Sequence, residues 1–415
     1  TGELAADGGL ARLPFDAAVV LCGNMVEAVL PAPPSASVLE SAERVLNCKG
    51  MSVVPGLIEG HAHPSFEDYV ETTDAGDMPP EEGVLHTVRN CSRLLQAGFT
   101  SAFSAAAARV RQDVVARNWI NAGYARGPRL LAASPEICPT GNLGDSSALH
   151  QPRQSFGLVA DGADEVRRAV RLCIREGVDT VKINIGGDLV PNNLLNADRT
   201  DMLSAYGEAE VQAACETAHG LERRVAAHCR GSNDVRLALA CGVDVIYHCD
   251  FAANDSSILD ALQQARGRVF VGPAVGLMHA LAPDVPDVKL LLDAQCRTYA
   301  ELRRRGLRIV VGGDYGFRAT PQGTNANDLV HFQTYFGFSA EEALVSATRV
   351  GGELMRLRVG QLRPGYLADL LVVDGEPWVE SGALLATEWS EQVRTPGIKA
   401  IVQDGVFVRN DIWSV

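Results

Sequence analysis

The chain of 415 residues lacks the features of a membrane protein or a nucleic-acid-binding protein. No apolar run approaches the roughly 20 residues that a membrane-spanning helix needs. The 37 Lys and Arg are outnumbered by 51 Asp and Glu, which gives a net charge of −14, whereas nucleic acid requires clustered basic residues. The start of the chain has no basic segment followed by an apolar one, so no signal peptide is expected. These absences favour a soluble enzyme that meets neither a membrane nor nucleic acid.

The cysteines lack the spacing of a metal-binding or redox motif. Ten are spread singly, with no Cys-x-x-Cys, and in a chain without a secretion signal this predicts reduced thiols in a cytoplasm. Cys229 and Cys249 directly follow His228 and His248. Because adjacent strand residues point in opposite directions, we expect these two thiols to pack outward against helices.

Lysine is scarce, since the chain contains only four. One of them, Lys182, lies within the β-branched run Thr-Val-Lys-Ile-Asn-Ile. Burial of an ammonium there is costly unless the group is paired or chemically changed. Lys182 is therefore a candidate for a special role.

Strand-like and helix-like stretches alternate from residue 51 onward. The expected strands are Ser52–Ile58, Thr100–Ser104, Arg129–Ala133, Thr180–Ile185, Arg224–His228, Val243–His248, Arg268–Val271 and Arg308–Val311. Amphipathic segments between them predict helices at Glu81–Gln96, Asp164–Glu176, Glu208–His219, Ser232–Ala240, Ser256–Arg266 and Asp287–Arg305. Eight such units over roughly 300 residues predict an α/β fold, a (β/α)8 TIM barrel over residues 51–357.

The two ends of the chain are β-rich and carry turn residues. Short strands are expected at Asp16–Cys22, Ala42–Asn47, Ala368–Val373 and Lys399–Val408. We expect residues 1–50 and 358–415 to pair into one small β-sandwich domain. The long loops after the barrel strands, Cys138–Gly157 and Gly186–Gly207 among them, are expected to hold the substrate.

A histidine pair follows the first barrel strand. Residues two apart in a strand point to the same side, so His61 and His63 can reach one ion. Four more candidate ligands lie at or near the ends of other apolar runs: Lys182, His228, His248 and Asp314. Because the strand ends of a barrel meet at one rim, this recurrence predicts a metal centre there.

Imidazoles and carboxylates suit Zn²⁺ and similar divalent ions such as Co²⁺ and Mn²⁺. Two ions need a bridge, and a lysine supplies one only when its amine reacts with CO₂ to give an anionic carbamate. Burial of Lys182 favours the free amine that this reaction requires. Asp314 would bind one ion and accept a proton from the attacking water.

These motifs resemble the amidohydrolase superfamily, in its binuclear branch with a carboxylated lysine. The resemblance rests on Pro55-Gly-Leu-Ile-Glu-Gly-His-Ala-His63, Val181-Lys-Ile183, Ala227-His228, His248, Gly313-Asp314 and Gly360-Gln-Leu-Arg-Pro-Gly-Tyr-Leu-Ala-Asp-Leu370. It implies that His61, His63 and Asp314 hold the buried ion, that His228 and His248 hold the exposed one, and that carboxylated Lys182 bridges both.

Within the superfamily the chain is most similar to Xaa-Pro and Xaa-Arg dipeptidase-like enzymes, ochratoxin-type amidases, and phenylurea or thiocarbamate hydrolases. By this resemblance Tyr206 hydrogen-bonds the substrate carbonyl or the tetrahedral oxyanion. The resemblance also implies a small-molecule substrate and a homo-oligomer. Members begin with a strand leading into Asp-Gly-Thr-Gly, which this sequence lacks, so a first sandwich strand is expected to be missing.

The resulting hypothesis is a metal-dependent hydrolase that cleaves a C–N bond in an amide, carbamate, thiocarbamate or urea. Alternatives on the same barrel are a dipeptidase, a lactonase or phosphotriesterase, and a deaminase. A non-catalytic scaffold is a further alternative. Lys182 could instead form a buried ion pair with Asp314, and Tyr206 could serve packing rather than substrate contact. Arg199 and Arg318 are candidates to capture a substrate carboxylate.

Overall fold

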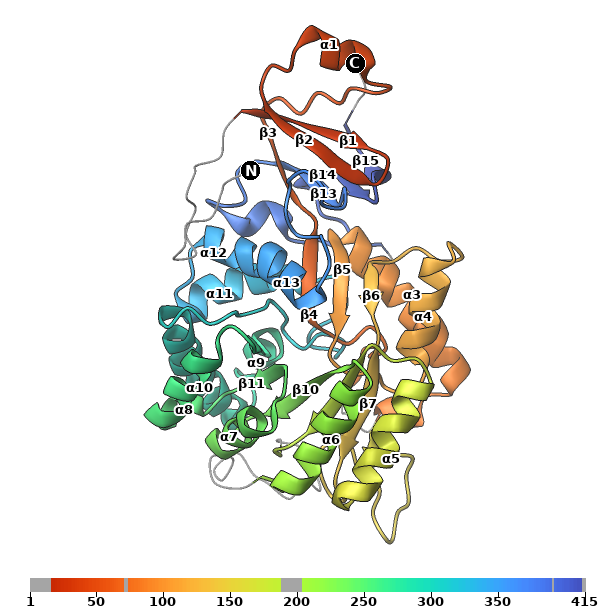
Figure 1. Ribbon diagram of the computed structural model, residues 1–415, viewed down its shortest axis with the longest axis vertical. Coiled ribbons are helices and arrows are strands. Elements are labelled where there is room, and N and C mark those ends of the chain that lie inside the picture. The colour runs from red at the N-terminus through yellow and green to blue at the C-terminus, as the bar shows by residue number, and fades with distance from the viewer. Residues whose placement is uncertain (1–15, 71–73, 188–203, 390–391, 413–415) are drawn as a thin grey trace.

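The computed structural model describes residues 16–70, 74–187, 204–389 and 392–412. Its larger part is a ring of parallel strands surrounded by helices (Figure 1). The strands of the ring are β4 (Leu57–Ala62), β5 (Phe99–Ser104), β6 (Arg129–Leu131), β7 (Ala133–Cys138), β9 (Thr180–Asn184), β10 (Arg224–Cys229), β11 (Val245–His248) and β12 (Phe270–Gly272). A short strand, β8 (Leu158–Val159), pairs with β7 beyond the ring.

Hydrogen bonds close this ring into a barrel. β4 pairs with β5 and β5 with β6, while β7 begins the sheet that continues through β9, β10, β11 and β12. β6 and β7 are one strand interrupted at Ala132, because β6 pairs with β5 and β7 pairs with β9. The segment 309–311 completes the circle: the Val310 amide donates to the Val271 carbonyl at 2.9 Å, and the Gly60 amide donates to the Val311 carbonyl at 2.8 Å.

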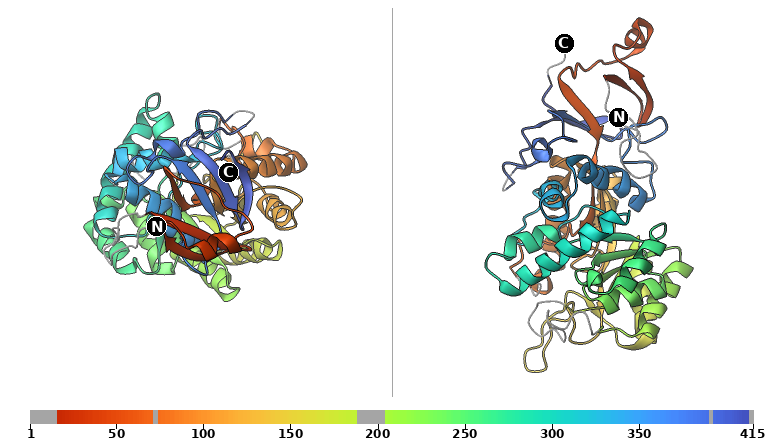
Figure 2. Two further views of the ribbon diagram at one scale, coloured as in Figure 1. Left: turned by 90° about the horizontal axis from the view of Figure 1, so that it is seen from above. Right: turned by 90° about the vertical axis from the view of Figure 1, so that its left-hand side faces the viewer.

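Helices cover the outside of the barrel, as Figure 2 shows. Those of the first half are α2 (Asp74–Asp77), α3 (Pro80–Gln96), α4 (Gln112–Asn121), α5 (Gly162–Arg175) and α6 (Glu208–Gly220). Those of the second half are α7 (Ser232–Cys241), α8 (Ser256–Ala265), α9 (Val275–Leu281), α10 (Pro286–Arg304), α11 (Asp328–Phe336), α12 (Ala340–Val345) and α13 (Gly351–Met355), the last two joined by a π-helical turn (Ser346–Val350). Short 3₁₀ turns in the described part of the chain lie at Ala252–Asn254, Asn325–Asn327 and Ser381–Leu384.

A smaller β domain lies at one end of the barrel (Figure 1). It contains the hairpin of β1 (Ala17–Cys22) and β2 (Met25–Pro31), which precedes helix α1 (Ala36–Ser41). It also contains an antiparallel sheet in the order β15-β14-β13-β3, formed by β3 (Met51–Pro55), β13 (Leu370–Asp374), β14 (Ile398–Gln403) and β15 (Val406–Asn410). The expected (β/α)8 barrel with a small β-sandwich is confirmed.

The prediction of one continuous strand at Ser52–Ile58 is wrong, because the structure has two strands there. The structure divides this run at Gly56, so that β3 joins β13 in the sandwich sheet and β4 begins the barrel. Glycine is required at the division, because a Cβ there would lie 2.1 Å from Oγ1 of Thr100. The domain limits at residues 51 and 357 themselves stay a prediction.

Two other strand predictions need correction. Ala42–Asn47 forms no strand, and the missed strand β2 follows the turn at Gly23 instead. The run Lys399–Val408 is two strands, because Asp404 and Gly405 form a turn with positive φ angles of 51° and 74°. Both errors arise because short apolar runs do not show where a turn reverses the chain.

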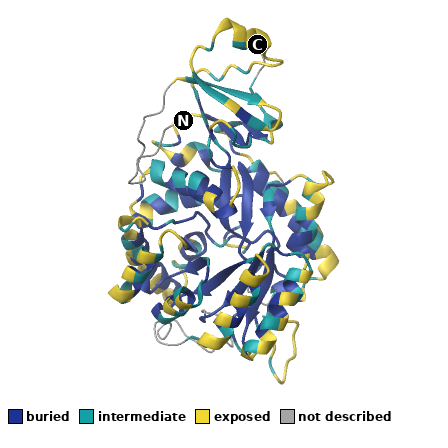
Figure 3. Cartoon of the chain, in the orientation of Figure 1, coloured by how far each residue is buried: buried dark blue, intermediate teal, exposed yellow. Residues whose placement is uncertain are grey.

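The buried core lies between the barrel strands and the helices around them (Figure 3). Outward-facing strand residues such as Val181 and Ile183 belong to this layer together with Val170 of α5 and Cys215 of α6. Cys229 and Cys249 lie in the same layer and are fully buried, which confirms the prediction that they face the helices. The alternation of strand residues therefore leaves the opposite face of each strand to line the barrel interior. None of the described helices is long and apolar enough to cross a membrane.

Candidate metal centre

All six predicted ligands lie at or near the carboxyl ends of barrel strands. His61 is the penultimate residue of β4 and His63 follows that strand, while Lys182 lies in β9. The others are His228 of β10, His248 at the end of β11, and Asp314, which follows the segment 309–311. The carboxyl ends of the strands carry the active sites of TIM-barrel enzymes.

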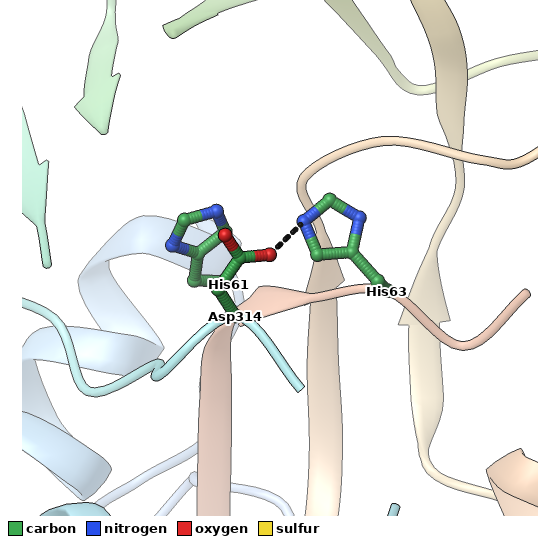
Figure 4. Close-up of side chains that lie close together, drawn as sticks. All are labelled: His61, His63 and Asp314. Carbon is green, nitrogen blue, oxygen red and sulfur yellow. Dashed lines mark ion pairs between the residues drawn. The ribbon is translucent and has the colours of Figure 1, made fainter. Parts of the chain in front are cut away.

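His61, His63 and Asp314 form the tightest group of the six (Figure 4). One ligand atom from each residue lies within 4.8 Å of the other two. Nε2 of His63 is 3.1 Å from Oδ1 of Asp314, and the two imidazole centroids are 5.3 Å apart. Two nitrogen donors and one carboxylate at this spacing fit a divalent cation such as Zn²⁺.

Backbone carbonyls orient both imidazoles of this group. Nδ1 of His61 is 2.8 Å from the carbonyl oxygen of Pro273, and Nδ1 of His63 is 2.9 Å from that of Ala106. A carbonyl only accepts hydrogen bonds, so each Nδ1 carries a proton, and in the neutral form of each ring Nε2 has the free lone pair. Nε2 of His61 is buried and has no hydrogen-bond partner among the described residues. A buried acceptor without a partner is costly, and a bound cation would satisfy it.

The electrostatics of this group suit a cation. Burial is the largest influence on His61 and lowers its pKa well below the usual value, so the imidazole is neutral. Burial acts to raise the pKa of Asp314, but the contact with Nε2 of His63 and the positive charges that His61, His63 and Lys182 carry when protonated outweigh it. The net pKa of Asp314 is therefore below its usual value, and the carboxylate is ionised. A neutral imidazole at His61 beside an ionised carboxylate is the state that metal binding requires.

A second group lies beside the first. The imidazole centroids of His228 and His248 are 4.2 Å apart, and that of His248 is 5.3 Å from that of His61. Nδ1 of His248 is buried without a partner among the described residues, whereas Nε2 of His228 is 3.2 Å from the Gly187 carbonyl oxygen. His248 has a φ of 73°, an uncommon left-handed conformation that ends β11 and redirects the chain at this residue.

Lys182 is buried inside the barrel, with only 1 % of its surface exposed. Its Nζ lies 4.7 Å from the centroid of the Tyr247 ring, and in the described part of the chain it has no carboxylate within ion-pair distance. The alternative of an ion pair with Asp314 is therefore wrong. Burial lowers the pKa of this amine, while the negative charges of Glu136 and Asp314 act in the opposite direction. The free amine needed for reaction with CO₂ is thus favoured.

Tyr206 lies in the core, although the resemblance predicted a contact with substrate. It is 2 % exposed, packs in the layer between strands and helices, and donates its hydroxyl to the Ala160 carbonyl at 2.8 Å. The structure thus supports packing, the alternative that the sequence left open. A tyrosine before a helix has the same sequence pattern in both roles, because the pattern does not show the direction of the ring.

Of the two arginines considered for a substrate carboxylate, the structure describes only Arg318. Arg199 lies outside the described residues, as does most of the segment that precedes Tyr206. Arg318 is exposed, and its backbone amide donates to the Tyr69 carbonyl.

Three residues of the centre were missed from the sequence. Tyr247 stacks on His61 with centroids 3.9 Å apart and donates its hydroxyl to the Gly60 carbonyl at 2.7 Å. Glu136 and Asn184 are buried on strands β7 and β9, joined by a hydrogen bond of 2.6 Å. The available signal was a polar residue inside an apolar run, two residues beyond Lys182 in the case of Asn184.

Glu59 is also buried, and its carboxylate supports strand β4. Its Oε1 accepts from the His61 amide and its Oε2 from the Asn325 side chain, both at 3.1 Å. Burial, followed by the charge of Asp328, raises the pKa of Glu59 to about 8. Both oxygens of the Glu59 side chain thus accept hydrogen bonds within the protein.

Comparison with known proteins finds a matching family and related enzymes. The amidohydrolase family profile matches residues 52–408. Ochratoxinase from Aspergillus niger is 26% identical over 356 residues, which cover 78% of this chain and 70% of that protein. Imidazolonepropionase from Cutibacterium acnes is 26% identical over 416 residues, covering 95% of this chain and 91% of that protein.

The fold of this chain is similar to that of proteins whose structures have been solved. The crystal structure of a Xaa-Pro dipeptidase with bound methionine has a TM-score of 0.81 and 23% sequence identity, covering 98% of this chain and 97% of that chain. At 23% sequence identity the similarity shows a shared fold. It does not identify the substrate, because one fold can serve enzymes with many different substrates.

Proposed function

Because this chain belongs to the amidohydrolase family and is a hydrolase of carbon–nitrogen bonds, we propose that it cleaves a small-molecule amide, carbamate, thiocarbamate or urea. We propose that the reaction uses metal-activated water. We propose Zn²⁺ as the ion, with Co²⁺ and Mn²⁺ as substitutes. The proposal depends above all on the group of His61, His63 and Asp314.

The donor set fits a divalent ion on chemical grounds. Two imidazoles supply nitrogen donors, their Nδ1 atoms donate to backbone carbonyls, and Asp314 supplies a carboxylate. The buried Nε2 of His61 has no other use in the described structure. We propose that His228 and His248, whose rings lie beside this group, hold a second ion.

Lys182 fits the role of bridge. Its amine is buried, lies in the strand between those that carry Glu136 and His228, and forms no ion pair in the described residues. Addition of CO₂ to this neutral amine forms a carbon–nitrogen bond, releases one proton, and creates an anionic group with two oxygen donors. We propose this carbamate as the ligand shared by the two ions.

Asp314 is the proposed acid–base residue. Bound divalent ions supply Lewis acidity at the carbonyl and lower the pKa of the attacking water. Asp314 accepts a proton from that water as the oxygen–carbon bond forms, and returns it to the nitrogen as the carbon–nitrogen bond breaks. An ionised carboxylate that already contacts His63 is positioned for this transfer.

A substrate screen tests the proposal. The metal-loaded full chain is incubated with N-acyl amino acids, dipeptides, aryl ureas and thiocarbamates, and amine release is measured against the Asp314→Asn variant. We expect release from at least one class with the wild type and none with the variant. Turnover confined to organophosphates or lactones, or release of ammonia from an amino-substituted ring, would contradict the proposal in favour of the alternative reactions.

A further inference from the structure

A buried pair of polar side chains lies inside the barrel next to the candidate ligands. Glu136 of β7 is in register with Lys182, and Asn184 of β9 is in register with His228. Glu136 is 5 % exposed and Asn184 is fully buried. Since Lys182 and Asn184 are two residues apart in one strand, they share the inward face. The pair therefore borders the metal centre, yet the proposed hydrolysis gives it no role.

The pair presents one buried hydrogen-bond acceptor that lacks a donor in the described structure. Nδ2 of Asn184 donates to Oε2 of Glu136 at 2.6 Å, which fixes the direction of the amide because a carboxylate accepts. Oδ1 of Asn184 is then left buried without a partner in the described structure. An unsatisfied buried acceptor is costly and indicates a donor that arrives with a ligand.

The charge of Glu136 points to the kind of donor. No cation lies within ion-pair distance of this carboxylate in the described structure, and Lys182 is no exception. A buried carboxylate without a cationic partner is unfavourable, so a positively charged ligand group would be stabilised here. A protonated amine offers three donors on one charged nitrogen, which matches one carboxylate and one amide oxygen.

We propose that Glu136 and Asn184 bind a protonated amino group of the substrate close to the scissile carbonyl. This inference rests on the proposed function and narrows its substrate class to amides that carry a free amine near the reacting bond. The pair acts as a specificity element, whereas Asp314 and the ligands carry the reaction. Substrates with an acylated amine lose both the charge and two of the donors.

A matched pair of substrates tests the proposal. L-alanine para-nitroanilide carries the free amine, and N-acetyl-L-alanine para-nitroanilide lacks it, while both release the same product. The readout is the ratio of kcat/KM for the free amine to kcat/KM for the acetylated compound. The wild type should favour the free amine, and Glu136→Gln should lower the ratio about 10- to 100-fold, the effect expected for loss of one charged hydrogen bond.

Two further variants control for folding. Glu136→Asp keeps the charge on a shorter side chain and should give an intermediate ratio. Asp369→Asn changes a buried carboxylate outside the centre, where Arg129 keeps Asp404 as a second partner at 2.6 Å, and should leave the ratio unchanged. Metal content is measured for every variant. Loss of metal from Glu136→Gln would overturn the proposal by making Glu136 a ligand.

The remaining outcomes separate this inference from the proposed function. Equal kcat/KM for both anilides with the wild type would overturn the inference, as would an equal loss of kcat/KM for both in Glu136→Gln. Either result would leave the proposed hydrolase function intact. If neither anilide is cleaved, calorimetry with L-alaninamide and N-acetyl-L-alaninamide decides. Binding of L-alaninamide but not of N-acetyl-L-alaninamide, with loss of that binding in Glu136→Gln, would support the inference and contradict the proposed reaction. Absence of binding of L-alaninamide would overturn the inference.

Discussion

The two halves of the candidate centre are built differently. His61, His63 and Asp314 are within 4.8 Å of one another, and both histidines are fixed by backbone carbonyls of neighbouring barrel segments. His228 and His248 come from two strands, and Nε2 of His228 is 3.2 Å from the Gly187 carbonyl. The first half thus gathers three donor residues at one point, whereas the second half contributes two imidazoles. We therefore expect the first half to bind its ion more tightly.

The largest effect is expected from Asp314→Asn, which changes the first half. The amide cannot accept the proton of the attacking water, and it is a weaker ligand than a carboxylate. Turnover should fall by at least about 10³-fold, within the range for loss of a general base. The measurement is kcat with an amide that the wild type cleaves. A rate near that of the wild type would remove Asp314 from the reaction.

Lys182→Ala should separate the two halves. Without the bridging carbamate we expect metal content to fall from about two ions to about one per chain, with the remaining ion in the first half. Elemental analysis after dialysis measures this. Lys289→Ala is the matched control, because Lys289 is exposed and pairs with Asp293 at the surface. Two ions retained in Lys182→Ala would show that the bridge is unnecessary.

Tyr206→Phe should have a small effect, because the structure places this residue in the core. Loss of the hydrogen bond to Ala160 should lower the free energy of unfolding by about 1 kcal/mol. Turnover should stay within about 2-fold of the wild type, since the ring still fills its place. Denaturant unfolding and kcat/KM are the measurements. A loss of turnover without loss of stability would restore the substrate contact that the sequence suggested.

The smallest effect is expected at His219, a histidine outside the centre. Its hydrogen bond with Asp244, 2.8 Å long, raises the pKa of the imidazole. A raised folded-state pKa gives stabilisation that is fully present below the unfolded pKa of about 6.5 and is lost as pH rises through the folded pKa. His219→Gln should lower Tm at pH 6 and have less effect at pH 9. The corresponding loss in the free energy of unfolding should be less than about 1 kcal/mol, because the side chain is partly exposed. An equal loss at both pH values would show that the charge is not involved.

Much of the first half was predictable, because it follows from strand periodicity. His61 and His63 are two residues apart at the end of an apolar strand, and alternation alone places them on one side. The partner Asp314 follows another apolar run at the same rim. The barrel was predictable for the same reason, since each of its strands begins a repeated strand–helix unit.

The rest could not be predicted because it depends on contacts between distant segments. Glu136 and Asn184 are visible in the sequence only as polar residues within strands, and their hydrogen bond depends on the register of β7 and β9. The division of the first strand at Gly56 depends on the close approach of Thr100. The packing of Tyr206 depends on Ala160, 46 residues earlier in the chain.

The most direct test of the central claim is a crystal structure of the metal-loaded chain grown with bicarbonate, with anomalous diffraction to locate the ions. We predict two anomalous peaks, one among His61, His63 and Asp314 and the other beside His228 and His248. Density for a carboxyl group on Nζ of Lys182 should lie between them. A single peak with an unmodified Lys182 amine would contradict the account.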